Sequence, residues 1–461
     1  MFAPFFLALT CSMIRAIIPA FVFALAVIFC HFFFQHQEIY LHTLGKVITT
    51  WEKIEDVPTE VYKPYIPLSE DGLDNWDASH YFMIKNYGYD LTVSKGEYIY
   101  AFFPAFPLLL KYSQIPTVYI PFLNFILFVI GLLFLIAAFT PPKDALQGAM
   151  LCFMFPGIIS FIIPYSESLF FLCISIAFFG FVKKHYWLVF IGLIVAGTVR
   201  PAVAIFLISL LCGAIYTMIK SRKINSGLGR LAFFTLPLTA GTFAVMLYQW
   251  GSGSSSLFAF ADAQKLWDHY FRIPTELRDW SLEGFGMNMF VLFVFAPFVL
   301  GLYLPMLVNM FKSPDTHVSK LEFIQISSLA YVTGSSLFVL FFQGGSLNGL
   351  FRYVLSTPMF FVLILSFFEK IQEQALLRSV AAYFLLALIC IMVMSNNAFA
   401  EIWNFFDLGL YISLAGLLLG IQINLSRNTY WKILGWIVIL GNALWTSYLF
   451  NNFLSDSWIF T

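Results

Sequence analysis

Long apolar runs separated by short polar turns make up most of the chain. They predict helices near residues 13–35, 116–140, 146–163, 168–182, 187–199, 202–219, 231–249, 287–311, 323–342, 354–368, 379–395, 408–425 and 433–450. A transmembrane helix needs about 20 apolar residues, whereas a transmembrane strand needs only about 10 residues of alternating character. The runs are long and continuous, so the sequence predicts an all-α polytopic membrane protein with about 11–13 spans.

The composition agrees with this fold class. Of the 461 residues, 60% are hydrophobic and only 11% are charged, against about 25% charged residues in a soluble protein. This excludes a soluble enzyme, a disordered protein and a nucleic-acid binder with a basic face. The six cysteines lie in apolar runs without a C-x-x-C pair, which is typical of small buried hydrophobes. We therefore expect a single integral-membrane domain over residues 1–461.

The charges predict which loops face the cytoplasm. With Arg15 inside, 14 of the 25 Lys and Arg residues fall in inside segments together with five acids. The outside segments then hold 11 cations and 20 acids, as the positive-inside rule requires. Two outside segments are long enough to fold, a first outer loop at 36–115 and a second at 250–286. Function is expected in these loops and beneath them.

The first outer loop contains two predicted amphipathic helices. Apolar residues at helical spacing over 41–54 predict a helix on the membrane surface. A second helix is predicted to follow Asp74 and to end at Gly88. Its repeating positions are Trp76, His80, Met83, Ile84 and Tyr87.

Asp77, near the start of this second helix, has two compatible interpretations. Asp74 and Asp77 could form a capping box, or Asp77 could accept a proton from a sugar hydroxyl, its ionised form favoured by the helix start. His80, one turn later, could pack at the interface, donate to a phosphate or orient Asp77. No D-x-D triplet, H-E-x-x-H motif or closely spaced His pair is present, so no metal site is predicted.

Several segments of the chain resemble a family of membrane glycosyltransferases. The strongest are Trp-Asp-Ala-Ser-His-Tyr at 76–81, Gly-Tyr at 88–89 and Ala-Phe-Phe-Pro-Ala-Phe-Pro at 101–107. They resemble the first-loop motifs of the PIG-V-like mannosyltransferases. Three later segments fit in order, namely Tyr-Ser-Glu-Ser-Leu at 165–169, Ala263-Gln264 with Trp267, and Arg352-Tyr353 with Pro358. One departure is Pro201, which follows Arg200 where many relatives have a polar residue.

The resemblance implies a GT-C fold and a specific reaction. Mannose would pass from a polyprenyl-phosphate donor to a glycolipid, glycan or protein acceptor, with inversion at the anomeric carbon and with Asp77 as the base. No cofactor or metal is implied, because a monophosphate carrier leaves readily. The implied partners are the lipid-linked sugar, the acceptor and membrane lipid, without nucleic acid.

The remaining candidates are few and each has a structural alternative. Arg200 and Arg352 each lie at the outer end of a predicted span. Each could bind the donor phosphate or extend its side chain to the lipid headgroups. We expect Arg352 to be the principal phosphate ligand, with Tyr353 beside it. Glu167 could bind the sugar or pair with Arg200. Substrate contacts are also expected from these aromatic and polar side chains: Trp76, Tyr81, Gln264 and Trp267.

Other functions are also compatible with the sequence. The chain could be a flippase or transporter of lipid-linked sugars, although inverted repeats and broken mid-membrane helices are not detected in the sequence. It could also be a GT-C enzyme that moves another sugar, an oligosaccharide ligase, or a non-catalytic subunit. The motif around Gln264 favours a bacterial or archaeal cytoplasmic membrane with an outward-facing site, with the lumenal face of the endoplasmic reticulum as the alternative.

Overall fold

The computed structural model describes most of the chain. The described residues are 3–33, 66–93, 96–141, 144–201, 203–266, 270–274, 286–312, 317–371, 409–410, 412–417, 419–420, 429–456 and 459–460. The predicted surface helix at 41–54 and the predicted span at 379–395 lie outside them, and the predicted span at 408–425 is covered only in part.

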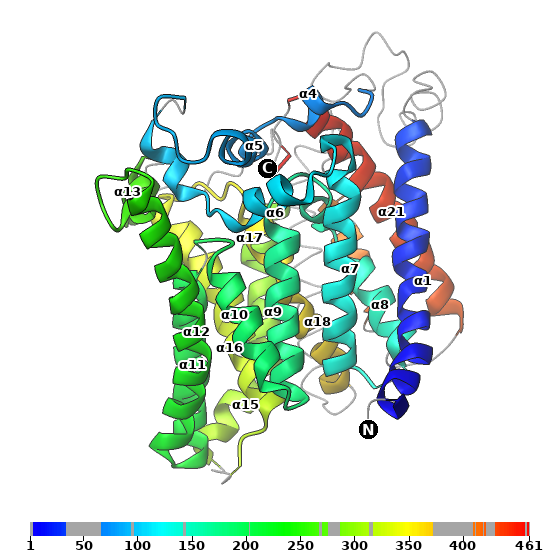
Figure 1. Cartoon of the computed structure of the whole chain (residues 1–461). Helices are drawn as coiled ribbons and strands as arrows, with labels where there is room; N and C mark the ends of the chain where they lie inside the picture. Colours follow the sequence, from blue (N-terminus) through cyan, green and yellow to red (C-terminus); the bar gives the residue numbers. More distant parts are fainter. Residues whose placement is uncertain are drawn as a thin grey trace.

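Throughout these residues the regular elements are helices, which confirms the all-α fold class (Figure 1). The long elements are α1 (Ala3–Phe33), α7 (Ile120–Phe139), α9 (Glu167–Val182), α10 (Tyr186–Gly197), α11 (Val203–Ser221), α12 (Ile224–Gly251), α15 (Ala296–Lys312), α16 (Lys320–Phe342), α18 (Pro358–Ile371) and α21 (Thr429–Leu454). Of the segments described, seven are long and apolar enough to cross a membrane. The protein is therefore a multi-pass membrane protein.

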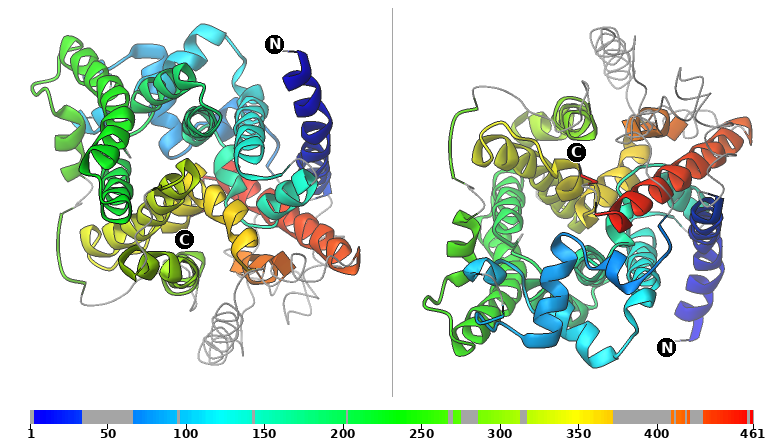
Figure 2. Two further views of the ribbon diagram at one scale, coloured as in Figure 1. Left: turned by 90° about the horizontal axis from the view of Figure 1, so that it is seen from below. Right: turned by 90° about the horizontal axis from the view of Figure 1, so that it is seen from above.

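The helices form one bundle whose two ends differ. Figure 1 places the start of α1 at the lower end, while the short helices α4 (Glu70–Leu73), α5 (Asp77–Tyr87) and α6 (Ala105–Ser113) cover the upper end. These three short helices thus lie as a cap across the ends of the spans. Seen along the bundle axis, α1 and α21 lie together at one edge and α12 at the opposite edge (Figure 2).

Close helix packing shapes the part of the bundle beneath this cap. The backbones of α10 and α12 touch where Gly197 faces Gly241, because a Cβ at either glycine would collide with a carbonyl oxygen of the other helix. The two runs predicted at 187–199 and 202–219 are confirmed as α10 and α11. The shorter α10 ends at Gly197, and Arg200 follows in the turn before α11.

The predicted continuous span at 146–163 is wrong. The chain does run from the lower to the upper end here, but α8 (Ala145–Phe153) stops early, and a 3-10 turn, η6 (Ile158–Phe161), follows Gly157 in a left-handed conformation. Pro156 and Gly157 interrupt the helix. The carbonyl groups that lose their helical partners are hydrogen-bonded by a buried side-chain amide. Nδ2 of Asn442 donates to the backbone oxygens of Phe153 and Phe155, both at 2.9 Å.

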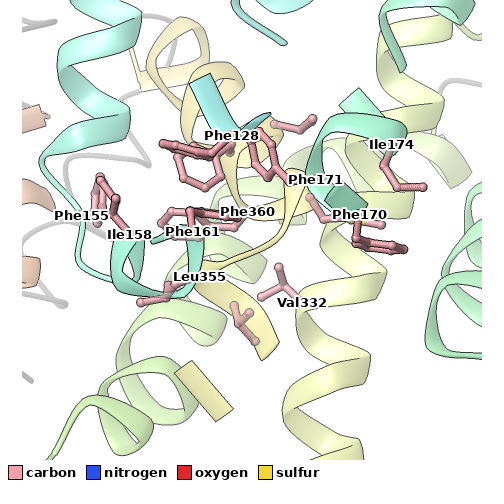
Figure 3. Close-up of a cluster of buried hydrophobic side chains, with 14 of the residues drawn as sticks. Phe128, Phe155, Ile158, Phe161, Phe170, Phe171, Ile174, Val332, Leu355 and Phe360 are labelled. Atoms are coloured by element: carbon pink, nitrogen blue, oxygen red, sulfur yellow. The ribbon is translucent and has the colours of Figure 1, made fainter. Parts of the chain in front are cut away.

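An aromatic core fixes the broken span in place (Figure 3). The ring of Phe161 stacks on Phe128 of α7 with a centroid distance of 4.1 Å, and Phe171 of α9 packs against both. All three side chains are fully buried. This core holds the upper start of α9, which carries Glu167, in a defined position.

Candidate active site

Asp77 is the first residue of α5, and its environment differs from the capping-box interpretation. Asp74 closes α4, and Trp76 precedes α5 with φ of 54° and no side-chain cap. Asp74 therefore cannot cap α5, and that interpretation is wrong. Gly88 ends the helix in a positive-φ conformation, as predicted. The loop before α5 is anchored by Asn75, whose Nδ2 donates to the backbone oxygen of Phe453 in α21 at 2.9 Å.

The carboxylate of Asp77 is one end of a chain of four charged side chains. Nη1 of Arg352 donates to Oδ2 of Asp77 at 2.7 Å, and Nε of Arg352 donates to Oε1 of Glu167 at 2.6 Å. Nη1 of Arg200 lies 3.0 Å from the same Oε1. The order is thus acid, base, acid, base, and the four charges cancel within the group.

Burial distinguishes the two ends of this ionic chain from its middle. The side chains of Glu167 and Arg352 are 0% and 5% exposed, whereas those of Asp77 and Arg200 are 30% and 13% exposed. Asp77 and Arg200 are therefore the members that a substrate can reach. Glu167 pairs with Arg200, as one of its two interpretations predicted, and it also pairs with Arg352. With both pairs formed, the Glu167 side chain has no exposed surface that a sugar could contact.

Arg352 does not snorkel to the headgroups. Its guanidinium carbon lies 4.3 Å from the ring centroid of Tyr165 and 4.9 Å from that of Phe460, in addition to its two carboxylate partners. A planar guanidinium with two directed hydrogen bonds and two aromatic neighbours has one orientation. Arg352 therefore fixes the position of the Asp77 carboxylate.

The short helix α17 (Leu350–Leu355), which carries Arg352, is itself fixed by two residues outside the sequence motifs. The backbone amide of Phe351 donates to Oδ1 of Asn288 at 2.9 Å. The amide of Gly349 donates to the backbone oxygen of Phe460 at 3.0 Å, and Nδ2 of Asn288 donates to the same oxygen at 3.2 Å. Asn288 is an isolated polar side chain at the start of an apolar run, a pattern that indicates a buried hydrogen-bonding role. Nothing in the sequence distinguishes Phe460 from the other phenylalanines.

His80 packs against aromatic rings rather than pairing with Asp77. Its ring centroid lies 4.4 Å from that of Phe102 and 5.2 Å from that of Tyr98, and its Nδ1 is buried without a hydrogen-bond partner. Burial lowers the pKa of His80, although Asp77 and Asp74 oppose this shift. The imidazole is therefore neutral near pH 7 and does not offer a cation to a phosphate.

The aromatic candidates divide into exposed and buried groups. Trp76, next to Asp77, is exposed, whereas Tyr81 is buried and its hydroxyl lies 2.7 Å from that of Ser166. Tyr81 thereby ties α5 to the residue before Glu167. Burial raises the pKa of Tyr81, so its hydroxyl stays protonated. Tyr353 follows Arg352 in α17 and is partly buried.

The candidates of the second outer loop are placed only in part. Gln264 lies on the short helix α13 (Ala259–Lys265) and is partly buried, while Trp267 lies outside the described residues. Among the described residues, Gln264 makes no hydrogen bond or ion pair with the four side chains of the ionic chain. Within the described ranges, no three His, Cys, Asp or Glu side chains are grouped to hold a metal ion.

No protein-family model, no curated protein and no solved structure matches this chain.

Proposed function

We propose that this protein is an inverting glycosyltransferase that moves mannose from a polyprenyl-phosphate donor to a glycan, glycolipid or protein acceptor. The observation that carries the proposal is the accessible Asp77 carboxylate held by the buried Arg352 at the end of a membrane-embedded helix bundle. A buried arginine that orients a partly exposed acid is costly to build, and such arrangements are concentrated at functional sites.

The proposed reaction uses this carboxylate as a base. The acceptor hydroxyl oxygen attacks the anomeric carbon while its proton moves to Asp77, and the bond between that carbon and the phosphate oxygen breaks. The electron pair leaves with the polyprenyl phosphate. Because attack and departure occur on opposite faces of the sugar, a single displacement inverts the anomeric configuration.

The geometry favours Arg200 over Arg352 as the ligand of the donor phosphate. Arg352 already donates to two carboxylates and is almost fully buried, whereas Arg200 has one such partner and is more exposed. We therefore assign the donor phosphate to Arg200, where a cation stabilises charge that develops as the sugar leaves. Arg352 acts through Asp77 as a positioning residue.

The charge distribution supports an outward-facing site. The turn between α11 and α12 contains Arg222 and Lys223, and the turn between α9 and α10 contains Lys183 and Lys184. Both turns lie at the lower end of the bundle, opposite Asp77 (Figure 1). By the positive-inside rule the lower end is cytoplasmic, so a lipid-linked donor would be used on the outer or lumenal face.

Reconstitution of the full chain in sealed vesicles tests the proposal. We expect transfer of radiolabelled mannose from a polyprenyl-phosphate donor to a soluble mannotriose acceptor, with an α-linked product from a β-linked donor and no transfer from GDP-mannose. Movement of the intact donor across the bilayer without a new glycosidic bond would identify a flippase instead. Product that retains the donor's anomeric configuration would exclude the single displacement.

A further inference from the structure

A pocket of about 480 Å³ opens at the other end of α5 from Asp77. It lies between the C-terminal end of α5 and the C-terminal end of α12, and its lining includes Tyr87, Tyr248 and Asp90. None of these residues takes part in the ionic chain. The pocket and Asp77 thus share one helix but are separate sites.

The polar side of this pocket is pre-organised to accept hydrogen bonds. Oδ1 of Asp90 accepts bonds from the backbone amide and the hydroxyl of Thr92, at 2.9 and 2.7 Å. These bonds lower the pKa of Asp90, and they leave Oδ2 available in an exposed side chain. A fixed carboxylate with a free oxygen accepts well from hydroxyl groups.

The apolar side consists of two exposed aromatic rings. Tyr87 and Tyr248 are 60% and 42% exposed. The ring of Tyr248 packs edge-on against Tyr89 with centroids 5.8 Å apart, and Tyr89 is held by a 2.6 Å bond from its hydroxyl to the backbone oxygen of Phe102. The ring of Tyr248 is therefore supported by Tyr89 on its protein side and open to solvent on the other side.

Two glycines keep the floor of the pocket free of side chains. Gly88 and Gly253 both have positive φ values, of 69° and 101°, and a Cβ built on either would meet no atom within 4 Å. A ligand can therefore approach the backbone at both positions. Aromatic faces, a free carboxylate oxygen and accessible backbone together suit a ligand with apolar C–H faces and several hydroxyls.

We infer that this pocket binds a sugar of an oligosaccharide acceptor, at a distance from the residue that is mannosylated. The inference rests on the proposed function and specifies its acceptor class. Tyr87 lies ten positions after Asp77 in the same helix, which corresponds to about 15 Å along the helix axis. A single hexose cannot span that distance, so the acceptor that uses both sites is an extended glycan.

Binding measured without donor tests the inference separately from transfer. The full chain in lipid nanodiscs would be titrated with fluorescent mannotriose and with a fluorescent pentapeptide. We expect mannotriose to bind, with Asp90→Asn weakening it about 10-fold or more through loss of a charge-assisted hydrogen bond. Tyr248→Ala should weaken it about 3- to 10-fold through loss of apolar contact. The matched controls are Asp71→Asn and Tyr112→Ala, two exposed residues of the same cap outside the pocket.

Each outcome decides one of the two proposals. Mannotriose that fails to bind, or that binds equally to pocket and control variants, overturns the pocket, as does preferential binding of the peptide. Pocket-dependent binding without any transfer from a polyprenyl donor supports the pocket and refutes the transferase. Transfer to mannotriose with an acceptor KM unchanged by Asp90→Asn leaves the transferase standing and overturns the pocket.

Discussion

Replacement of Arg352 by lysine separates a positioning role from phosphate binding. Arginine reaches Asp77 through Nη1 and Glu167 through Nε, from two edges of one planar group. A lysine has one nitrogen and cannot reproduce this geometry. Because Glu167 keeps its partner Arg200, the variant should lose mainly the bond to Asp77.

The expected magnitude follows from that single bond. A hydrogen bond to a charged group contributes about 1.5–3 kcal/mol, which corresponds to roughly a 10- to 150-fold change in rate at about 1.4 kcal/mol per factor of ten. If Arg352 acts through Asp77, Arg352→Lys should lower kcat by about this factor and leave the donor KM nearly unchanged.

Steady-state transfer assays with a double-mutant cycle measure this effect. Asp77→Asn combined with Arg352→Lys should be little slower than Asp77→Asn alone, because the lost interaction is already absent. Thermal unfolding of each variant controls for a folding defect. The reasoning is refuted if Arg352→Lys raises the donor KM while kcat is preserved, since Arg352 would then be the phosphate ligand, or if it has wild-type kinetics.

Substitutions at three further positions test the neighbouring assignments. Arg200→Lys should raise the donor KM more than it changes the acceptor KM, because a point charge replaces bidentate phosphate binding; equal effects on both would remove Arg200 from the donor site. Asn288→Leu should lower both kcat and thermal stability, by about 1–3 kcal/mol for the latter, because the amide of Phe351 loses its buried acceptor. Asn288→Asp, which keeps an oxygen acceptor, should recover part of the rate, and no recovery would contradict the positioning role. Burial lowers the pKa of His80, so below about pH 6.5 the unfolded state binds a proton more readily than the folded state. The free energy of unfolding should therefore decrease as the pH drops below about 6.5. Melting curves of His80→Asn should show a smaller loss in this range, and identical pH dependence would show that His80 is not the group responsible.

Much of the fold follows from the sequence because membrane spans are encoded locally. Apolar runs and turn charges predicted α1, α7, α11 and α16 and placed Asp77 and Arg352 at the same end of the bundle. The break in the span after α8 was less predictable, because Pro156 and Gly157 lie within an apolar run. The carbonyl groups that the break leaves without helical partners are hydrogen-bonded by the side-chain amide of Asn442, which is distant in the sequence. Hydropathy does not record such long-range hydrogen bonds.

The site was predictable in its members but not in its connections. The sequence identified Asp77 by its motif at the start of a predicted helix, and it identified Glu167, Arg200 and Arg352 as charges beside apolar runs. Arg352 lies 275 residues from Asp77 along the chain, and only folding shows that these two are the partners. The sequence favoured Arg352 as the phosphate ligand because it does not show that the Arg352 guanidinium already donates to the carboxylates of Asp77 and Glu167.

Single-turnover transfer by Asp77→Asn tests the central claim most directly. The variant would be loaded with a saturating polyprenyl-phosphate-mannose donor, with donor binding measured on the same sample, and compared with wild type and with Asp74→Asn, an exposed acid three residues away. If Asp77 is the base, the transfer rate should fall by roughly 10²- to 10⁴-fold, with donor affinity unchanged and Asp74→Asn close to wild type. A rate for Asp77→Asn within a few-fold of wild type would contradict the account.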